Sequence, residues 1–302
     1  MTQDDAGRAV VTGAFGRRMA LRVDGDAEVN ARIRGRRLRP VCGDFVTAEP
    51  IPNESDWLIT SIEPRRNELT RPDTRGRKEI LAANVSCVAV VAAPEPAPDW
   101  FIVDRYLAAA ENMASKGIVV FNKTDLDDGT NRDRHLDDYV AAGYRIIECS
   151  AANGENIELL AEALADETTV IVGQSGVGKS SVINRLVGAK EQRTGALSGS
   201  SGEGRHTTVN SVMIELPNGG TVIDSPGVRD YAPAIMDVQD VQRGFPEIDR
   251  AGQDCRFANC QHLREPNCAV KAAVDDGSIS ERRYESYRRL IRLADELSRK
   301  AR

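Results

Sequence analysis

The sequence predicts a multidomain protein with an N-terminal β-barrel, a central α/β domain and a small, mostly helical C-terminal domain that binds metal. Residues 1–75 alternate short apolar runs with turn residues, and residues 76–235 alternate apolar strands with helices. Residues 236–302 place a group of cysteines and a histidine between helical segments. At 302 residues the chain is long enough for three domains with their own cores.

Composition and charge exclude several classes of protein. Hydrophobic residues make up 41% and charged residues 28%, as in ordinary soluble proteins. There is no run of about 18 apolar residues, and the polar stretch Met1–Ala9 does not resemble a signal peptide, so we expect a cytoplasmic protein with no membrane span. The net charge of −6 does not indicate nucleic-acid binding, but basic residues gather in Arg32–Arg39 and Glu281–Arg302. Each patch is either a solvated face or a phosphate-binding surface.

The N-terminal region is predicted to be a barrel because its apolar runs are short, closely spaced and separated by glycine and proline. The clearest runs are Met19–Val23, Ala31–Ile33, Asp44–Ala48 and Trp57–Ile62. Periodicity alone does not distinguish an OB-fold from an SH3-like barrel.

The central region is predicted to form a parallel sheet with helices on both faces, because strands and helices alternate along the chain. Its expected strands are Val85–Ala92, Gly117–Phe121, Tyr144–Cys149 and Thr168–Val172, and its clearest helices are Asp99–Ala114 and Ile157–Leu164. Polar motifs follow directly after the strands, which is where such sheets bind ligands.

One of these motifs, GQSGVGKS, fits the phosphate-binding loop pattern. Its glycines allow backbone N–H groups to surround a β-phosphate at the start of a helix. Lys179 is expected to bridge the β- and γ-phosphates, and the Ser180 hydroxyl is expected to ligate Mg²⁺. The predicted nucleotide-binding residues of this loop are Gly173, Gln174, Ser175, Gly176, Val177, Gly178, Lys179, Ser180 and Ser181.

A second motif, NKTD, selects the base. The carboxylate of Asp125 can accept hydrogen bonds from N1–H and the N2 amine of guanine together, whereas adenine would leave it unpaired. Asn122 is expected to tie this loop to the phosphate loop, and the stem of Lys123 to cover the base. Thr124 completes the predicted guanine-binding motif.

Two shorter elements complete the nucleotide site. Ser150 and Ala151 follow a strand and fit the element that backs guanine with a main-chain N–H. DSPG fits the DxxG motif, in which Asp224 would hold Mg²⁺ through a water and Gly227 would donate its N–H to the γ-phosphate. The base-reading motif precedes the phosphate loop, which reverses the ordinary order. The sequence therefore predicts a circularly permuted P-loop GTPase core.

The GRHTT segment follows a Gly/Ser-rich stretch that gives the freedom needed for an order–disorder switch. Thr207 or Thr208 can ligate Mg²⁺ when the γ-phosphate is present; the sequence does not decide between them, and we assign Thr208 together with Ser180. Many GTPases place a water-orienting glutamine after DxxG, but this chain has Val228. His206 is therefore the candidate catalytic residue, and the alternative is a solvated loop histidine.

The six cysteines fall into two groups. Cys42, Cys87 and Cys149 are scattered and are predicted to be buried thiols. The other group offers three thiolates and one imidazole, a set that suits a tetrahedral structural zinc with no open position, one per chain. The alternative is free thiols in a helical hairpin. The predicted zinc ligands are Cys255, Cys260, His262 and Cys268.

Taken together, NKTD, SA, GQSGVGKSS, GRHTT, DSPGVR and C-x4-C-x-H-x5-C resemble the RsgA family, the ribosome small subunit-dependent GTPases, over nearly the whole chain. The resemblance implies an N-terminal OB-fold, a circularly permuted GTPase core and a C-terminal zinc domain. It implies a bacterial factor that acts late in maturation of the 30S subunit, with GTP hydrolysis to GDP stimulated by that subunit and catalysed by His206. Both basic patches would then bind 16S rRNA, and we expect a monomer.

Two other functions stay open at this point. A nucleotide-gated RNA-binding scaffold with negligible hydrolysis is compatible with Val228, and a metal-dependent enzyme acting on RNA would need an open position in the cysteine cluster. An ATPase is disfavoured by Asp125. Because the chain after DxxG runs to the metal-binding domain, we expect movement of this switch to act on a C-terminal RNA-binding module.

Overall fold

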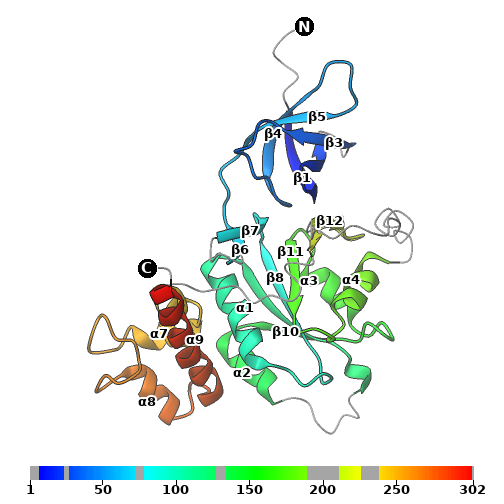
Figure 1. Ribbon diagram of the computed structural model, residues 1–302. Helices are drawn as coiled ribbons and strands as arrows, with labels where there is room; N and C mark the ends of the chain where they lie inside the picture. Colours follow the sequence, from blue (N-terminus) through cyan, green and yellow to red (C-terminus); the bar gives the residue numbers. More distant parts are fainter. Residues whose placement is uncertain are drawn as a thin grey trace.

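The computed structural model describes residues 7–23, 27–72, 78–126, 134–188, 211–225 and 238–300. A barrel lies at one end of the molecule, an α/β core follows it, and a helical unit packs against the side of the core (Figure 1). The predicted domain boundaries at residues 75 and 235 fall outside the described residues. The same is true of four predicted site residues: His206, Thr207, Thr208 and Gly227.

The barrel consists of five strands whose apolar side chains alternate toward a common core, with Val11, Leu21, Val46 and Ile59 fully buried. The strands are β1 (Gly7–Phe15), β2 (Arg18–Val23), β3 (Ala27–Ile33), β4 (Phe45–Pro50) and β5 (Trp57–Ile62). They pair in the order β1-β2-β3-β5-β4, and β4 pairs again with β1, which closes the barrel. The β3–β5 pair is parallel. This closed order is that of an OB-fold, which confirms the predicted fold.

Strand β1 belongs to both the barrel and the core. Its first half pairs with β4, while Gly13 and Ala14 pair with Val212 and Ser211 of β12 (Ser211–Glu215). A register shift between Val11 and Gly13 marks the place where the strand passes from one to the other. The thiol of Cys42 lies at this seam. The barrel and the core therefore share one continuous sheet.

Barrel and core are also joined by a hairpin of two antiparallel strands, β6 (Glu68–Pro72) and β7 (Lys78–Ala83). The buried amide of Asn84 donates to the carbonyl of Gly43 at 2.8 Å and accepts from the backbone N–H of Arg66 at 2.8 Å. The amide of Asn67 donates to the carbonyl of Val85 at 2.8 Å. These side chains hold the base of the hairpin against both neighbours.

The core sheet continues from β12 in the order β12-β13-β11-β8-β9-β10. Its strands are β8 (Cys87–Ala92), β9 (Lys116–Phe121), β10 (Arg145–Glu148), β11 (Thr168–Gly173) and β13 (Thr221–Asp224), and these five are parallel as predicted. β12 is antiparallel to β13 because only a short turn separates them, and a short turn can join only antiparallel neighbours. The base-reading strand β9 precedes the phosphate-loop strand β11 in the chain, which is the permuted order.

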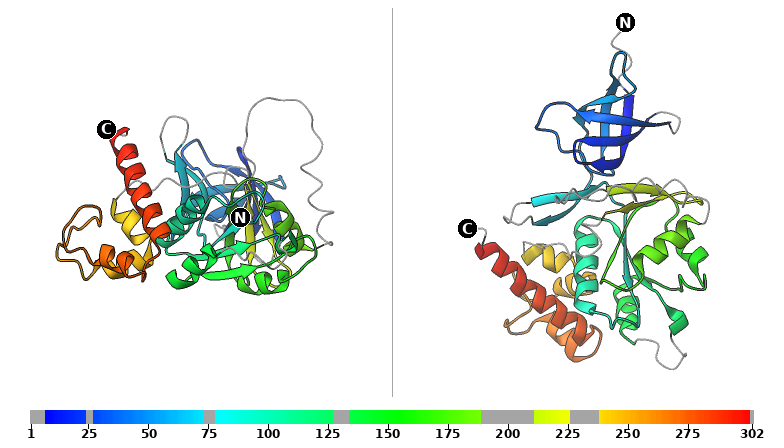
Figure 2. Two further views of the ribbon diagram at one scale, coloured as in Figure 1. Left: turned by 90° about the horizontal axis from the view of Figure 1, so that it is seen from below. Right: turned by 45° about the vertical axis from the view of Figure 1, so that its right-hand side comes forward.

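Helices cover both faces of the core sheet (Figure 2). One face packs against α1 (Trp100–Asn112) and α2 (His135–Ala142), the other against α3 (Ile157–Ala163) and α4 (Lys179–Val187). Strand β8 shows why: Val88 and Val90 pack on the α1 side, and Ala89 and Val91 pack on the α3 side. A parallel strand buried on both faces needs this continuous apolar sequence. The scattered thiols of Cys42, Cys87 and Cys149 are fully buried, as predicted.

The C-terminal unit is helical and packs beside α1 (Figure 1). Its helices are α6 (Val238–Arg243), α7 (Pro246–Gly252), α8 (Ala269–Asp275) and α9 (Glu281–Lys300). Its apolar core includes Phe245, Tyr287 and Leu290, and Ala108 of α1 is part of the same cluster. In the described part of the chain, every helix is too short or too polar to cross a bilayer.

Candidate nucleotide site and metal cluster

The sequence motifs meet at one edge of the core sheet. Asn122 follows β9, Ser150 follows β10, the phosphate loop follows β11, and Asp224 is the last residue of β13. These are the carboxyl ends of neighbouring parallel strands, where α/β sheets bind their ligands.

The side chain of Asn122 joins three of these loops. It is 1% exposed, and its Nδ2 donates to the carbonyl of Val177 in the phosphate loop at 2.9 Å. Its Oδ1 accepts from the backbone N–H of Ala151 at 3.0 Å. A single buried amide thus fixes the base-reading loop, the phosphate loop and the Ser150–Ala151 element relative to one another.

Lys123 crosses from the base-reading loop to the phosphate loop. Its backbone is left-handed, with φ of 65°, and its ammonium donates to the carbonyl of Gly176 at 2.8 Å and to that of Glu95 at 2.7 Å. The aliphatic stem of Lys123 therefore spans the gap between the base-reading loop and the phosphate loop, where an aromatic base could stack on it. Glu95 belongs to the segment between β8 and α1, which the sequence motifs did not single out.

Asp125 is positioned by the next loop. Its exposed carboxylate accepts a hydrogen bond from the hydroxyl of Ser150, which is itself buried. Thr124 donates its hydroxyl to the carboxylate of Glu155 at 3.2 Å. The Asp125 carboxylate keeps acceptor capacity on its open side, which is what pairing with the N–H groups of guanine requires.

The phosphate loop has the backbone that its glycines allow. Gly178 has φ of 93°, and a Cβ there would lie 2.4 Å from Nδ2 of Asn122. Lys179 begins α4 and is 7% exposed; its ammonium donates to the carbonyls of Gly173 and Gln174, both at 2.8 Å. The loop is therefore curled around the lysine head at the positive end of a helix, which favours phosphate.

The remaining loop residues differ in exposure. Ser175 and Gly176 are exposed at the tip of the loop, and Ser180 and Ser181 are exposed in the first turn of α4, while Val177 is buried. Gln174 faces away from the loop tip: its Oε1 accepts the backbone N–H of Asp99, the N-cap of α1, at 3.1 Å. This contact ties the phosphate loop to α1, and no motif predicts it.

The described residues bring together three cysteines and one histidine in the C-terminal unit. The ligand atoms of Cys255, Cys260, His262 and Cys268 all lie within 4.8 Å of one another. Sγ of Cys255 is 3.8 Å from Sγ of Cys268, and Nδ1 of His262 is 3.5 and 3.4 Å from these two sulfurs. Around a tetrahedral zinc, ligand bond lengths of about 2.3 Å for sulfur and about 2.0 Å for nitrogen place sulfurs about 3.8 Å apart and sulfur and nitrogen about 3.5 Å apart. The cluster therefore fits a metal ion such as zinc.

The electrostatics of the cluster suit metal binding. Burial would raise the pKa of the Cys255 thiol, but hydrogen bonds from the backbone N–H groups of Val270 and Ala269 and from neighbouring thiols bring it below its usual value. Burial lowers the pKa of His262, which favours the neutral imidazole that binds metals. Burial raises the pKa of the Cys260 thiol to about 12, so this thiol is protonated at neutral pH, and a bound metal would displace the proton.

Two further groups shape the cluster. The carboxylate of Glu265 accepts three backbone N–H groups, those of Gln261, Leu263 and Arg264, at 2.9 to 3.0 Å. These bonds lower the pKa of Glu265 to about 2, against the effect of its burial, and fix the turn between His262 and Cys268. From α9, the hydroxyl of Tyr284 donates to the carbonyl of His262 at 2.5 Å. The sequence offered no signal for either role.

Comparisons with known proteins agree with this architecture. A model of the RsgA GTPase family matches residues 62–233. The small ribosomal subunit biogenesis GTPase RsgA of Saccharophagus degradans is 39% identical over 272 residues, which cover 86% of this chain and 79% of the relative. The RsgA protein of Alcanivorax borkumensis is 39% identical over 299 residues, which cover 95% and 85%.

Two solved structures share the fold along their length. The crystal structure of YjeQ from Thermotoga maritima has a TM-score of 0.77 and 28% identity, and covers 96% of this chain and 98% of its own. YloQ, described as a circularly permuted GTPase, has a TM-score of 0.75 with 24% identity, and covers 98% of both chains. With its permuted core, its barrel and its Cys/His cluster, the chain belongs to the RsgA family of GTPases.

Proposed function

We propose that the protein hydrolyses GTP to GDP as a late maturation factor of the 30S ribosomal subunit, and that engagement of the subunit stimulates hydrolysis. The observation that carries the proposal is the convergence of the base-reading loop, the phosphate loop and the Ser150–Ala151 element on Asn122. The relatives are named for small ribosomal subunit biogenesis, which supplies the partner. We place the protein in the cytoplasm, as a monomer.

In this proposal Asp125 reads guanine, and the backbone of Gly173–Ser180 with Lys179 holds the phosphates. The hydroxyls of Ser180 and Thr208, together with Asp224 through a water, would hold Mg²⁺, and the backbone N–H of Gly227 would donate to the γ-phosphate. Mg²⁺ would supply charge neutralisation between the β- and γ-phosphates. His206 orients or deprotonates the attacking water, since Val228 offers no hydrogen bond. This last role separates a working GTPase from a scaffold that only binds nucleotide.

The barrel supports an RNA partner through a basic groove that we call the junction groove. Two cavities of about 810 and 790 Å³ lie along the barrel where it meets the β6–β7 hairpin, and they share Leu38, Arg39 and Lys78. The first is also lined by Arg37 and Arg66, which are exposed. Five basic residues and two acidic ones line that cavity: Arg37, Arg39, Arg65, Arg66 and Lys78, with Glu63 and Glu68. Arg65 and Lys78 form ion pairs with Asp44 and Glu68, so Arg37, Arg39 and Arg66 are the residues that favour a phosphate backbone.

Ion pairs within the protein reduce the number of arginines in each basic patch that can contact RNA. Arg32 forms ion pairs with Glu54 at 2.5 Å and Asp56 at 2.9 Å, which leaves Arg36, Arg37 and Arg39 as the exposed arginines facing the groove. In the C-terminal patch, Arg282 and Arg283 are held in ion pairs within the protein. The outward arginines of α9, among them Arg292, stay available to RNA.

We propose that zinc in the Cys/His cluster is structural. The three distances among Cys255, Cys268 and His262 fit zinc, and the thiol of Cys260 lies within 4.8 Å of all three ligand atoms, which supports a four-ligand site. A closed site of four protein ligands has no position for a reacting water. This argues against a metal-dependent RNA enzyme. We also propose that the domains span residues 1–75, 76–235 and 236–302.

Titration of GTP turnover with purified 30S, 50S and 70S particles tests the function. We expect the 30S subunit to raise kcat. The double variant Arg37→Glu/Arg66→Glu should bind the 30S subunit more weakly and lower the slope of log K against log [salt] by about 1 for each phosphate that the protein no longer neutralises. Arg145→Glu, an exposed arginine on β10, is the matched control. Stimulation by the 50S subunit alone would contradict the proposed partner.

His206→Ala tests the catalytic assignment. Because the histidine would act on water and not on the nucleotide's base or β-phosphate, the variant should bind fluorescent GDP and GTP analogues as the wild type does. Its turnover should fall on the order of 100-fold, a common loss for a missing general base. Turnover equal to that of the wild type would exclude His206 from catalysis.

Asp125→Asn tests base recognition. The amide would offer a donor where guanine presents N1–H, so the affinity for GTP should fall by about 100-fold or more, while xanthosine triphosphate, with an oxygen at position 2, should bind better than GTP. Asp137→Asn, an exposed carboxylate on α2, should leave both affinities unchanged. Competition of both triphosphates against fluorescent GDP measures this, and an unchanged preference for GTP would refute the role of Asp125.

Metal analysis of the native protein should give about one zinc per chain. Cys260→Ser should lower this content and the thermal stability of the C-terminal unit, since binding energy at such a site stabilises the fold. Cys149→Ala, a buried thiol outside the cluster, should keep full zinc content. A native protein with well under one zinc per chain would argue for free thiols.

A further inference from the structure

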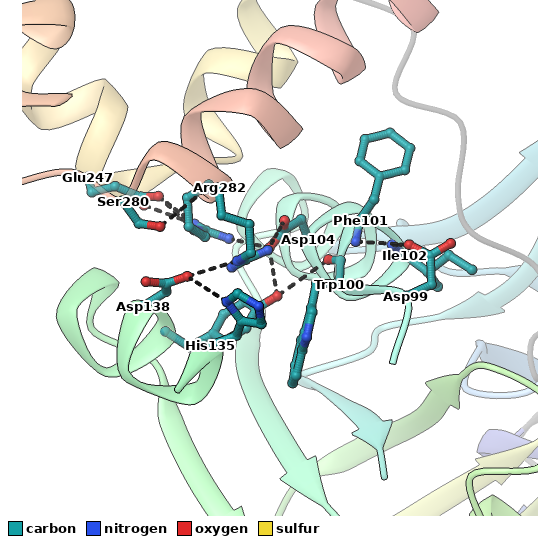
Figure 3. Close-up of polar contacts among 12 residues, drawn as sticks. Asp99, Trp100, Phe101, Ile102, Asp104, His135, Asp138, Glu247, Ser280 and Arg282 are labelled. Atoms are coloured by element: carbon teal, nitrogen blue, oxygen red, sulfur yellow. Dashed lines mark hydrogen bonds and ion pairs between the residues drawn. The ribbon is translucent and has the colours of Figure 1, made fainter. Parts of the chain in front are cut away.

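Two adjacent arginines of α9 bind carboxylates on α1, α2 and α7, and one of these carboxylates, that of Asp104, is fully buried. We call Arg282, Arg283 and their partners Asp104, Asp138 and Glu247 the arginine clasp (Figure 3). Arg283 is 1% exposed and donates to Oδ1 of Asp104 at 2.8 Å and to both oxygens of Glu247 at 2.8 and 2.9 Å. Arg282 donates to Oδ2 of Asp104 at 2.9 Å and to Asp138 at 2.8 Å. Each oxygen of Asp104 therefore holds one arginine.

The clasp fixes one arrangement of four helices. Asp104 lies on α1, Asp138 on α2, Glu247 on α7, and both arginines on α9. The guanidinium of Arg283 lies 4.7 Å from the ring centroid of Phe245, and the hydroxyl of Tyr139 donates to Asp104 at 2.8 Å. Guanidinium forks bind carboxylates in a fixed geometry, and a buried charge cannot exchange its partner for water. The helices cannot slide past one another without breaking these bonds.

Helix α1, which carries Asp104 of the clasp, contacts the nucleotide site at its start. Asp99 caps α1 by accepting the N–H groups of Phe101 and Ile102. The backbone N–H of Asp99 donates to Gln174 of the phosphate loop at 3.1 Å, one and a half turns of α1 before Asp104. The loop just before α1 also contributes the Glu95 carbonyl that binds Lys123. The start of α1 thus contacts the phosphate loop and the base-reading lysine.

On the other side, the clasp leads to the metal cluster. Tyr287 of α9 donates its hydroxyl to the carbonyl of Gln261 at 2.9 Å, beside the ligand His262. The ring of Tyr287 packs 5.7 Å from that of Phe245, which faces Arg283. Helix α9 therefore contacts the cluster through one set of side chains and α1 and α2 through the adjacent arginines.

We propose that Arg282 and Arg283 are positioning residues for GTP hydrolysis, which act through α1 on the phosphate loop. The rate of GTP hydrolysis then depends on whether the C-terminal unit is packed against α1. Displacement of α9 would release Asp104, move the start of α1 and loosen the Gln174 contact. A ligand of the C-terminal unit could in this way change turnover without touching the nucleotide.

The test uses the full-length protein without ribosomes, so it does not depend on the proposed 30S partner. In Arg283→Met, kcat for GTP should fall about 10-fold, because a small displacement of the phosphate loop affects the transition state most. KM and zinc content should stay as in the wild type. Hydrogen exchange should become faster at residues 97–104 and 173–180. Arg283→Lys, which keeps the charge but loses the fork, should lie between. Arg250→Met, an exposed arginine on α7, should match the wild type.

The result is different if the two arginines only hold α9 against the core and do not affect hydrolysis. If Arg283→Met speeds exchange only within α7–α9 and keeps the wild-type kcat, the proposal is overturned. If Arg283→Met does not fold, Arg282→Met decides, because that side chain is 19% exposed and its loss breaks the contacts with Asp104 on α1 and Asp138 on α2. A lowered kcat with faster exchange at 173–180 supports the clasp, and wild-type values for both in this variant refute it.

Discussion

The nucleotide site depends on the two hydrogen bonds of the Asn122 side chain. An amide can donate to Val177 and accept from Ala151 at the same time, and neither aspartate nor leucine can replace both bonds. Because Asn122 is 1% exposed, each backbone group deprived of its partner would stay without water, which costs about 1–3 kcal/mol. The three loops belong to distant parts of the sequence, and this amide joins the other two loops to its own.

The permuted order determines how that site connects to the rest of the molecule. Ser211 begins β12 soon after the GRHTT segment, and β12 pairs with β1 of the barrel. The chain after DxxG leads to α6, where the carbonyl of Asp240 accepts the side-chain amide of Asn112 on α1. The two segments expected to sense the γ-phosphate therefore lead to different neighbours, one to the barrel and one to the helical unit. The barrel also covers the edge of the core sheet, which would otherwise expose unpaired backbone groups.

Much of this could be predicted from sequence because the signals are local. Strands such as β8 are continuous apolar runs, α3 was predicted to within one residue of its observed bounds, and the metal-cluster spacing is contained in fourteen residues, from Cys255 to Cys268. The antiparallel course of β12 and the double role of β1 were not predictable, since pairing of Gly13 with Val212 joins residues that share no local pattern. The contact of Gln174 with Asp99 was missed for the same reason: one partner is a variable position of the loop pattern, the other an ordinary helix cap.

The arginines show most clearly where local reasoning fails. Arg32 and Arg36 belong to one basic run, yet the first is paired with Glu54 and Asp56 while the second lines the junction groove. In the C-terminal run, Arg283 is buried against Asp104, which lies 179 positions earlier, and Arg292 is exposed. A run of charged residues shows only that charge is present in that part of the sequence. Whether each side chain is paired or exposed depends on which carboxylates the fold brings near it. One run of arginines therefore supplies exposed charge on one side of α9 and binds α1 and α2 on the other.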